Sequence, residues 1–242
     1  MEIHSSSLAE YLTDLETKYL PVANRNAGIV GDFETKSYSV LAHAAFEQFF
    51  EDVALDFGHR LHSHWQSGKM MDRQLIACIG CIVSGEGNFL YLEADESKGQ
   101  ESPIHQLSKA LRKRVSSLRN AIDDNHGISL KFLRNMFGPL GINIQLDPDT
   151  QSGLTLIARN RGTFAHRRTP KLNGKFAHKP VAASDIVKYV KLVLTYCEKF
   201  ESEIAGMFTD KGVFLRAETR QHLLRDLHAA LQQVVKTKLQ NS

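Results

Sequence analysis

The stretch that decides the fold is YSVLAHAAFEQFFEDVALDFGHRLHSHW, residues 38–65. Apolar side chains recur along it at every fourth position: Leu41, Ala45, Phe49, Val53, Phe57 and Leu61. Positions four apart lie close to one face of an α-helix, so this spacing predicts one long amphipathic helix. A helix of this length needs partners to cover its apolar stripe, which favours a helical bundle.

The segments on both sides of this helix also show apolar residues at helical spacing. Strand patterns are sparse, there is no internal repeat, and we predict a mainly α fold: one helical domain over residues 1–242, with its core at about 38–205. Residues 84–102 form a small irregular insertion, and 21–32 read as a connection. Ser184 is the predicted N-cap of a late helix. The other predicted helices cover residues 8–20, 104–125, 129–137, about 150–161 and 215–239, and residues 147–150 are cap candidates for the helix at about 150–161.

Composition and charge bound the function. Three cysteines among 242 residues are too few for a disulfide framework, and the N-terminus does not resemble a signal peptide, so a cytoplasmic protein is expected. No apolar run approaches the roughly 20 residues that span a bilayer. Residues 151–180 hold seven Lys or Arg and no acid, and residues 106–135 hold seven more against two acids. Two such zones favour a partner that carries phosphates.

Several common sites are absent or weak. The sequence has no phosphate-binding GxxxxGK[ST] loop, no strand-borne GxGxxG and no GxSxG elbow. Cys78 and Cys81 form a lone CxxC in an apolar run and are interpreted as core residues. His59, His62 and His64 are interpreted as a solvated helix end rather than metal ligands. We therefore expect no metal and no cofactor.

The chemistry-bearing segment is LIARNRGTFAHRR, residues 156–168. It places the permanently charged guanidinium of Arg161 five positions before the imidazole of His166, which titrates near neutrality. Such a pair suffices to cleave RNA without metal. A base takes the 2′-OH proton, the oxygen attacks the adjacent phosphorus, an acid protonates the leaving oxygen, and arginine stabilises the anionic transition state.

The spacing alone does not select this pair. Arginine followed by histidine at a similar distance occurs four times: Arg119/His126, Arg159/His166, Arg161/His166 and Arg216/His222. Only the region 159–166 adds a preceding apolar helix, a glycine that allows close approach to a phosphate, and further flanking cations. Arg167, Arg168 and Lys171 are the predicted RNA-binding cations.

The string RGTFAH, the helix that begins after LDPDT, and the upstream YSVLAHAAFEQFFED together resemble the HEPN superfamily of small helical nucleases, in particular its RiboL-PSP-like branch. The resemblance covers most of residues 38–205, including SLKFLRNMFGPLGI. It implies a helical bundle that dimerises, a composite metal-independent RNA cleft built from the Arg and His of both subunits, and a toxin–antitoxin or antiphage setting with an antitoxin or other defence protein as partner.

Carried over residue by residue, the family's arginine corresponds to Arg161 and its histidine to His166, with Arg159 and Asn160 in support. Active members often have Asn, Asp or His after the arginine, whereas this chain has Gly162. On a regular helix five residues leave Arg161 about 140° from His166, and seven bring Arg159 to nearly the same face. We expect the helix to end or distort at Gly162, which would remove this difficulty.

His43 and Glu47 lie one turn apart on the long helix and are further supporting candidates. A local polar contact within the apolar stripe is the alternative for this pair. For the whole chain, the leading hypothesis is a homodimeric endoribonuclease. Two alternatives stay open: a non-catalytic HEPN-type module that binds RNA, a nucleotide or a protein, and a purely structural helical bundle.

Overall fold

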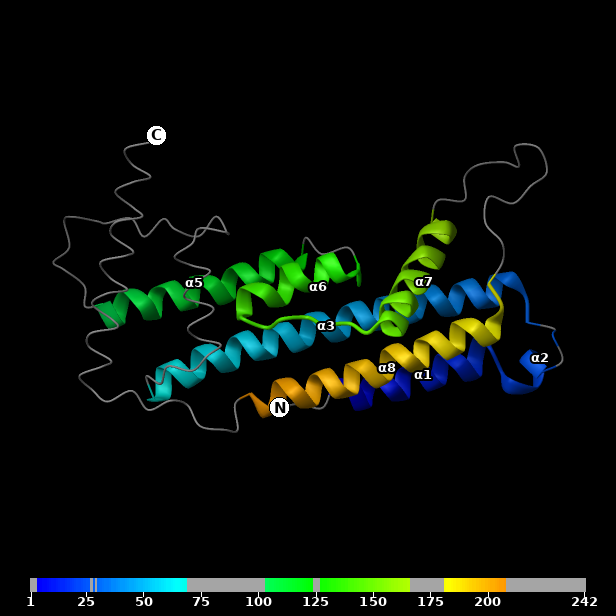
Figure 1. Cartoon of the computed structure of the whole chain (residues 1–242), viewed down its shortest axis with the longest axis horizontal. Helices are drawn as coiled ribbons and strands as arrows, with labels where there is room; N and C mark the ends of the chain where they lie inside the picture. The colour runs from blue at the N-terminus through cyan, green and yellow to red at the C-terminus, as the bar shows by residue number, and fades with distance from the viewer. Residues whose placement is uncertain are drawn as a thin grey trace, which may run out of the picture. The chain divides into compact units, whose positions relative to one another are not determined.

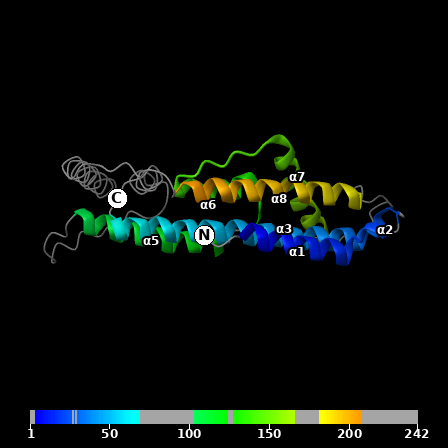
Figure 2. The same ribbon diagram turned by 90° about the horizontal axis from the view of Figure 1, so that it is seen from below.

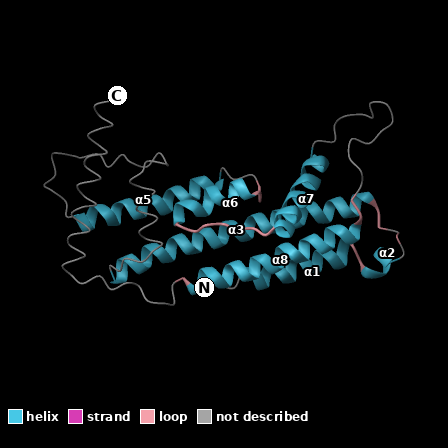
Figure 3. Ribbon diagram, viewed as in Figure 1, coloured by secondary structure: helices cyan, strands magenta, loops and turns pink. Residues whose placement is uncertain are grey.

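The computed structural model describes residues 4–26, 28, 30–68, 103–123, 127–165 and 181–207. All regular structure in these ranges is helical, and no strand occurs among them (Figure 3). The prediction of a mainly α fold is confirmed. Cys78, Cys81, the insertion at 84–102 and the predicted helix at 215–239 lie outside the described residues.

The helices follow one another along the chain as labelled in Figure 1. They are α1 (His4–Tyr19), α2 (Val22–Asn26), α3 (Asp32–Gly68), α5 (Pro103–Asp123), α6 (Leu130–Phe137), the 3-10 turn η1 (Gly138–Leu140), α7 (Pro148–Ala165) and α8 (Ala183–Gly206). None of these described helices has both the length and the apolar character needed to cross a membrane.

Three local predictions were wrong. The stretch 21–32 was expected to be a plain connection, but it contains the short helix α2. Ser184 does not cap α8, because the helix begins one residue earlier and its N-cap is Ala182, which makes no side-chain capping bond. Gly162 does not end α7, which continues to Ala165. A single glycine costs an α-helix only about 1 kcal/mol, less than the packing of its neighbours supplies.

The buried stripe of α3 differs from the one read at strict fourth positions. Leu41 and Ala45 are half-buried, whereas Ala42 and Phe46, one position further on, are fully enclosed. A spacing of four advances about 40° beyond each full turn of a 3.6-residue helix, so it drifts around the helix. The observed stripe corrects that drift by mixing steps of three and four: Tyr38, Ala42, Phe46, Phe49, Phe50, Val53, Ala54, Phe57, Leu61 and Trp65.

The chain divides into two compact units, and the boundary falls inside α3. Unit 1 comprises residues 1–53, 125–134 and 144–207, and unit 2 comprises 54–124, 135–143 and 208–242. Each unit is described by itself below. The prediction of a single domain stays a prediction.

Unit 1 is built around an antiparallel pair, α1 and α8, which run side by side in both ribbon views (Figures 1 and 2). The ring of Phe50 on α3 meets that of Phe200 on α8 edge to face at 6.0 Å, and Tyr196 stacks on Phe200 at 5.7 Å. The core of this unit is therefore aromatic as well as aliphatic. Such ring pairs add about 1 kcal/mol each beyond the area that they bury.

Two carboxylates fix the ends of this pair. Glu201, near the end of α8, is buried and accepts hydrogen bonds from the backbone N–H groups of His4 and Ser5 at 2.8 and 3.0 Å. These are first-turn amides of α1, which have no partner within their own helix. At the opposite end, Glu16 lies 2.7 Å from Arg25 and 3.4 Å from Lys191. The two carboxylates therefore set the register of α1 on α8.

Unit 2 joins the second part of α3 to α5. Trp65 is fully buried, and its indole N–H donates to the Ser108 hydroxyl at 2.8 Å. A Cβ added to Gly58 would lie 3.1 Å from Leu118, so the absence of a side chain there lets α5 approach α3 closely. Among the α5 side chains that the structure describes, those of Leu111, Leu118 and Ile122 are buried.

Candidate functional site

The site in unit 1 is built on α7, whose start is fixed by a local cap. Asp147 precedes the helix, and its carboxylate accepts hydrogen bonds from the hydroxyl of Thr150 at 2.6 Å and from its backbone N–H at 2.9 Å. Both bonds lower the pKa of Asp147, and the bond from the Thr150 hydroxyl has the larger effect. Pro148 follows at the first helical position, where its missing N–H costs nothing. The predicted cap at 147–150 is thereby confirmed.

Close packing on α8 then sets the course of α7. Gly153 is buried against α8, and a Cβ at this position would lie 3.1 Å from Val193 and 3.3 Å from the Tyr189 ring. Leu154 and Ile157 continue the same buried face toward the end of the helix. Figure 1 shows α7 crossing α8 and the first part of α3 at a steep angle. The last turns of α7 are thus brought to α3.

Asn160 makes the contact between these two helices. Its side-chain amide donates to the hydroxyl of Ser39 on α3 at 3.3 Å, although the two residues are 121 positions apart. Ser39 in turn donates to the carbonyl of Thr35 at 2.9 Å. Asn160 and Ser39 are both buried. A buried amide and hydroxyl would each be costly without a partner, so their bond specifies where α7 meets α3.

His43 lies one turn beyond Ser39 and is 1% exposed. Burial, and to a lesser extent the positive charge of Arg161, lowers the pKa of His43 from 6.5 to about 4. Its Nδ1 atom is 3.7 Å from the Glu47 carboxylate and has no hydrogen-bond partner among the described residues. Because the imidazole is neutral at pH 7, this contact is not an ion pair under ordinary conditions.

Arg161 is half-buried and close enough to His43 for its charge to affect that ring. It follows Asn160 directly, so the helix that Asn160 anchors also positions the guanidinium. Four of the predicted residues, Asn160, Arg161, His43 and Glu47, are thus brought to one region of unit 1. Arg159 lies on the exposed side of α7.

The remaining predicted residues are not part of this geometry. His166, Arg167, Arg168 and Lys171 lie outside the described residues, and α7 ends at Ala165, directly before His166. We expected α7 to end at Gly162, which would have removed the angle of about 140° between Arg161 and His166 on a regular helix. The helix instead continues to Ala165, so it does not end between these two residues before position 165.

Sequence reasoning missed Ser39. The signal for it was present, since Ser39 precedes His43 by four residues, just as His43 precedes Glu47, and the three therefore share one face of α3. A serine in a helix is usually explained by a bond to the preceding turn, which Ser39 also makes. Its second bond, to Asn160, depends on the tertiary fold.

The histidines at the end of α3 show no metal-binding arrangement. His59 is exposed, and His62 and His64 are half-buried. A nitrogen of His62 lies 3.3 Å from the Gln66 amide. Within the described part of the chain, no group of three or more His, Cys, Asp or Glu side chains could hold a metal ion.

These observations define a class: a helical bundle with a buried polar cluster where an arginine-bearing helix crosses a long central helix. Comparison with known families matches residues 10–206 to the RiboL-PSP-HEPN family. The chain belongs to this family, and the match begins earlier than the expected core at residue 38, so that it takes in most of α1. No curated protein and no solved structure matched in the other two comparisons.

Proposed function

We propose that this chain is a metal-independent endoribonuclease of the HEPN type, with Arg161 and His166 as its catalytic pair. The observation that supports it most is the arrangement of α7. Asn160 ties the helix to Ser39 of α3, Arg161 follows at the edge of the buried cluster, and the helix ends one residue before His166. A helix held in this way can carry a guanidinium rigidly, which is what transition-state stabilisation requires.

The proposed reaction is a transesterification. A base removes the proton of the 2′-OH, the 2′ oxygen forms a bond to the adjacent phosphorus, and the bond from phosphorus to the 5′ oxygen breaks. The leaving oxygen takes a proton from an acid, so the products carry a 2′,3′-cyclic phosphate and a 5′-OH. His166 is assigned acid–base chemistry, and Arg161 stabilises the anionic phosphorane-like transition state.

The other candidate residues have supporting roles in this proposal. Asn160, His43 and Glu47 hold the end of α7 against α3, and Arg159, Arg167, Arg168 and Lys171 contact the RNA backbone. Family membership supports a homodimer in which the Arg and His of both subunits form one cleft. It also favours action in the cytoplasm within a toxin–antitoxin or antiphage system, where an antitoxin or other defence protein restrains the activity.

The direct test is to incubate the purified protein with single-stranded RNA in EDTA and to analyse the product ends. Cyclic phosphate ends that survive EDTA are expected, with losses of about a hundredfold or more for Arg161→Ala and His166→Ala. Arg159→Ala is the matched comparison, since it removes the same charge from the exposed side of the same helix. An equal or greater loss for Arg159→Ala would reassign the catalytic guanidinium, and activity abolished by EDTA would reject the metal-free mechanism.

One observation favours a second candidate, a HEPN-type module that binds RNA, a nucleotide or a protein without cleaving RNA. Gly162 follows Arg161 within continuous helix, at a position where active members of the family often have Asn, Asp or His. The same incubation separates the two candidates. Unaltered RNA at high protein concentration, together with salt-sensitive binding, would favour the binding module.

A further inference from the structure

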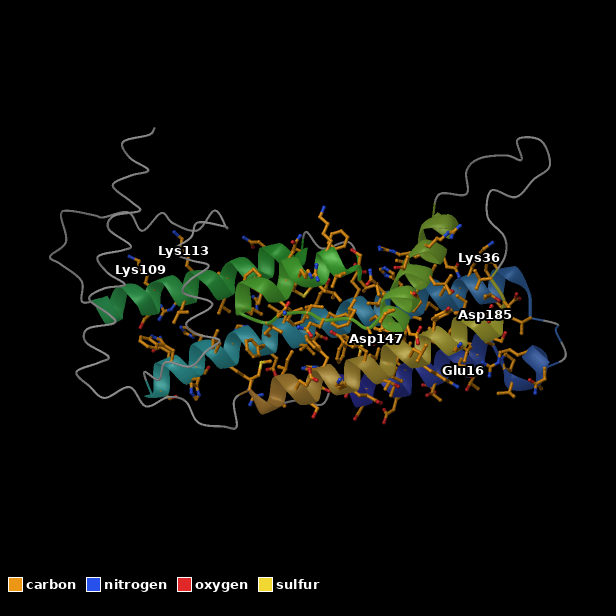
Figure 4. The ribbon with its side chains drawn as sticks, in the orientation of Figure 1. Glu16, Lys36, Lys109, Lys113, Asp147 and Asp185 are labelled. Carbon is orange, nitrogen blue, oxygen red and sulfur yellow. The ribbon has the colours of Figure 1, made fainter. Side chains whose placement is uncertain are left out.

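The exposed face of α5 carries part of the second basic zone of the sequence, and the proposed catalytic site does not use it. Four cations on this helix are exposed to solvent: Lys109, Arg112, Lys113 and Arg119. At 100° per residue they fall within an arc of about 120°. The buried residues Leu111, Leu118 and Ile122 occupy the opposite side. Figure 4 shows Lys109 and Lys113 pointing to the same side of α5, away from α3.

The other exposed side chains on this face are also polar. Ser116 and Asn120 lie on the same face and are exposed, and the first acid of the helix is Asp123 at its last position. From Lys109 to Arg119 the cations extend over about 15 Å of helix. The face therefore presents a row of positive charge with hydrogen-bonding groups in between, and no acid interrupts it before Asp123.

The character of this face points to a polyanion rather than a protein. Stable protein interfaces are anchored by apolar and aromatic side chains at their centre and are depleted of lysine there. Every exposed side chain that the structure describes on α5 is polar or charged. Nucleic-acid backbones, in contrast, are bound largely by Lys, Arg, Ser and Asn side chains without any apolar anchor.

We propose that the exposed face of α5, defined by Lys109, Arg112, Lys113 and Arg119, is a sequence-independent surface for the RNA phosphate backbone. The inference rests on the proposed function for its choice of RNA. It adds a second binding surface, in unit 2, which would retain long substrates through several phosphates. Such contacts add affinity and salt dependence but do not select sequence.

The test compares two variants that lose the same charge. One is the α5 triple variant Lys109→Gln, Arg112→Gln and Lys113→Gln. The control is the triple variant Lys18→Gln, Lys188→Gln and Lys199→Gln, whose side chains are exposed on α1 and α8. The probe is a fluorescein-labelled 20-nucleotide 2′-O-methyl RNA, which cannot be cleaved because its 2′ oxygen is blocked. Fluorescence anisotropy at several salt concentrations gives the Kd and its salt slope.

For the α5 triple variant we expect Kd at low salt to rise about tenfold or more and the salt slope to fall by about two, since each phosphate contact on a single strand contributes about 0.7 to that slope. The control should change Kd by less than about threefold. Equal losses in both triples would mean that only net charge matters and would overturn the proposal. So would an absence of probe binding by the unaltered protein.

Unchanged probe affinity in the α5 triple variant, accompanied by a lower melting temperature, would also overturn it. That result would mean that the face stabilises the fold of the chain rather than binding RNA. The measurement does not depend on catalysis. Absence of RNA cleavage by the unaltered protein would therefore reject the proposed function and leave this comparison intact.

Discussion

Polar side chains buried within the helical core of unit 1 specify how its helices pack. Ser39, His43 and Asn160 are all nearly or fully enclosed, in a core whose other buried side chains are mostly apolar. A buried polar group that bonds to a partner excludes alternative packings, because those would leave it unsatisfied. The position of α7 on α3 is thus specified more sharply than apolar contacts alone would achieve.

His43 makes the stability of the fold depend on pH. Its pKa is about 4 in the folded chain and 6.5 as a free side chain, so the unfolded chain binds a proton between these values while the folded chain does not. Stability is therefore lost as pH falls from about 6.5 toward 4. We expect a loss of about 2 kcal/mol in unfolding free energy from this residue between pH 7.5 and 5.

Urea unfolding at both pH values checks this, with His43→Gln as the comparison because its side chain does not titrate. The variant should be less stable at pH 7.5 but should lose about 2 kcal/mol less than the unaltered protein on acidification. Parallel losses in the two proteins would show that His43 is not the residue responsible.

The bond between Asn160 and Ser39 can be isolated by a double-mutant cycle. Asn160→Ala should lower the unfolding free energy by about 1–3 kcal/mol, since it removes a buried bond and leaves the Ser39 hydroxyl without that partner. In a Ser39→Ala background the same substitution should cost about 1 kcal/mol less. Urea denaturation of the four proteins gives the coupling. Costs that add to within about 0.3 kcal/mol would mean that the contact contributes nothing specific.

At the scale of the element, the position of α7, and with it that of Arg161, depends on Gly153. A Cβ at this position would meet Val193 at 3.1 Å and the Tyr189 ring at 3.3 Å. Gly153→Val therefore forces α7 away from α8 and should cost about 1–3 kcal/mol through overpacking. If the proposed function holds, RNA cleavage should fall as well, because Arg161 lies two turns further along the same helix.

Gln151→Val is the control for this prediction, since it places the same β-branched side chain on the exposed face of α7. It should change the unfolding free energy by less than about 1 kcal/mol. Thermal unfolding and initial cleavage rates are the two measurements. A loss for Gly153→Val no greater than that for Gln151→Val would show that the contact with α8 does not resist the added side chain.

Periodicity and capping predicted most of these elements. The apolar stripes of α3, α5 and α8 appear in the sequence, and Asp147 was recognised as a cap candidate because its bonds to Thr150 are local. Ser184 and Gly162 were read wrongly, because capping preference and glycine flexibility are small terms that packing overrides. Helix ends are the part of a fold least determined by local sequence.

At the scale of the whole molecule, the division into two units could not be predicted. It falls between Val53 and Ala54, inside a helix whose apolar stripe continues without a break. The periodicity of apolar residues shows that each turn of α3 is buried, but it does not show which helix covers that turn. The same reason explains the site: the sequence placed His43, Glu47, Asn160 and Arg161 among the candidates, while the bond from Asn160 to Ser39 arises only when residues 121 positions apart meet.

A composite site across a twofold axis makes a prediction that a monomeric site does not. If the cleft combines the Arg and His of two subunits, Arg161→Ala and His166→Ala homodimers are both inactive. Mixed dimers, however, still hold one intact Arg161 and one intact His166. Co-refolding the two variants should therefore restore cleavage, whereas each variant refolded alone should not.

The extent of recovery measures how the site is shared. Random exchange makes about half of the dimers mixed, so recovered activity is bounded by that fraction, and native mass spectrometry with differently tagged subunits verifies the exchange. Recovery requires the intact arginine and histidine to act on the same phosphate from different chains. Verified mixed dimers with no activity would contradict a site that is completed by one arginine and one histidine from different chains.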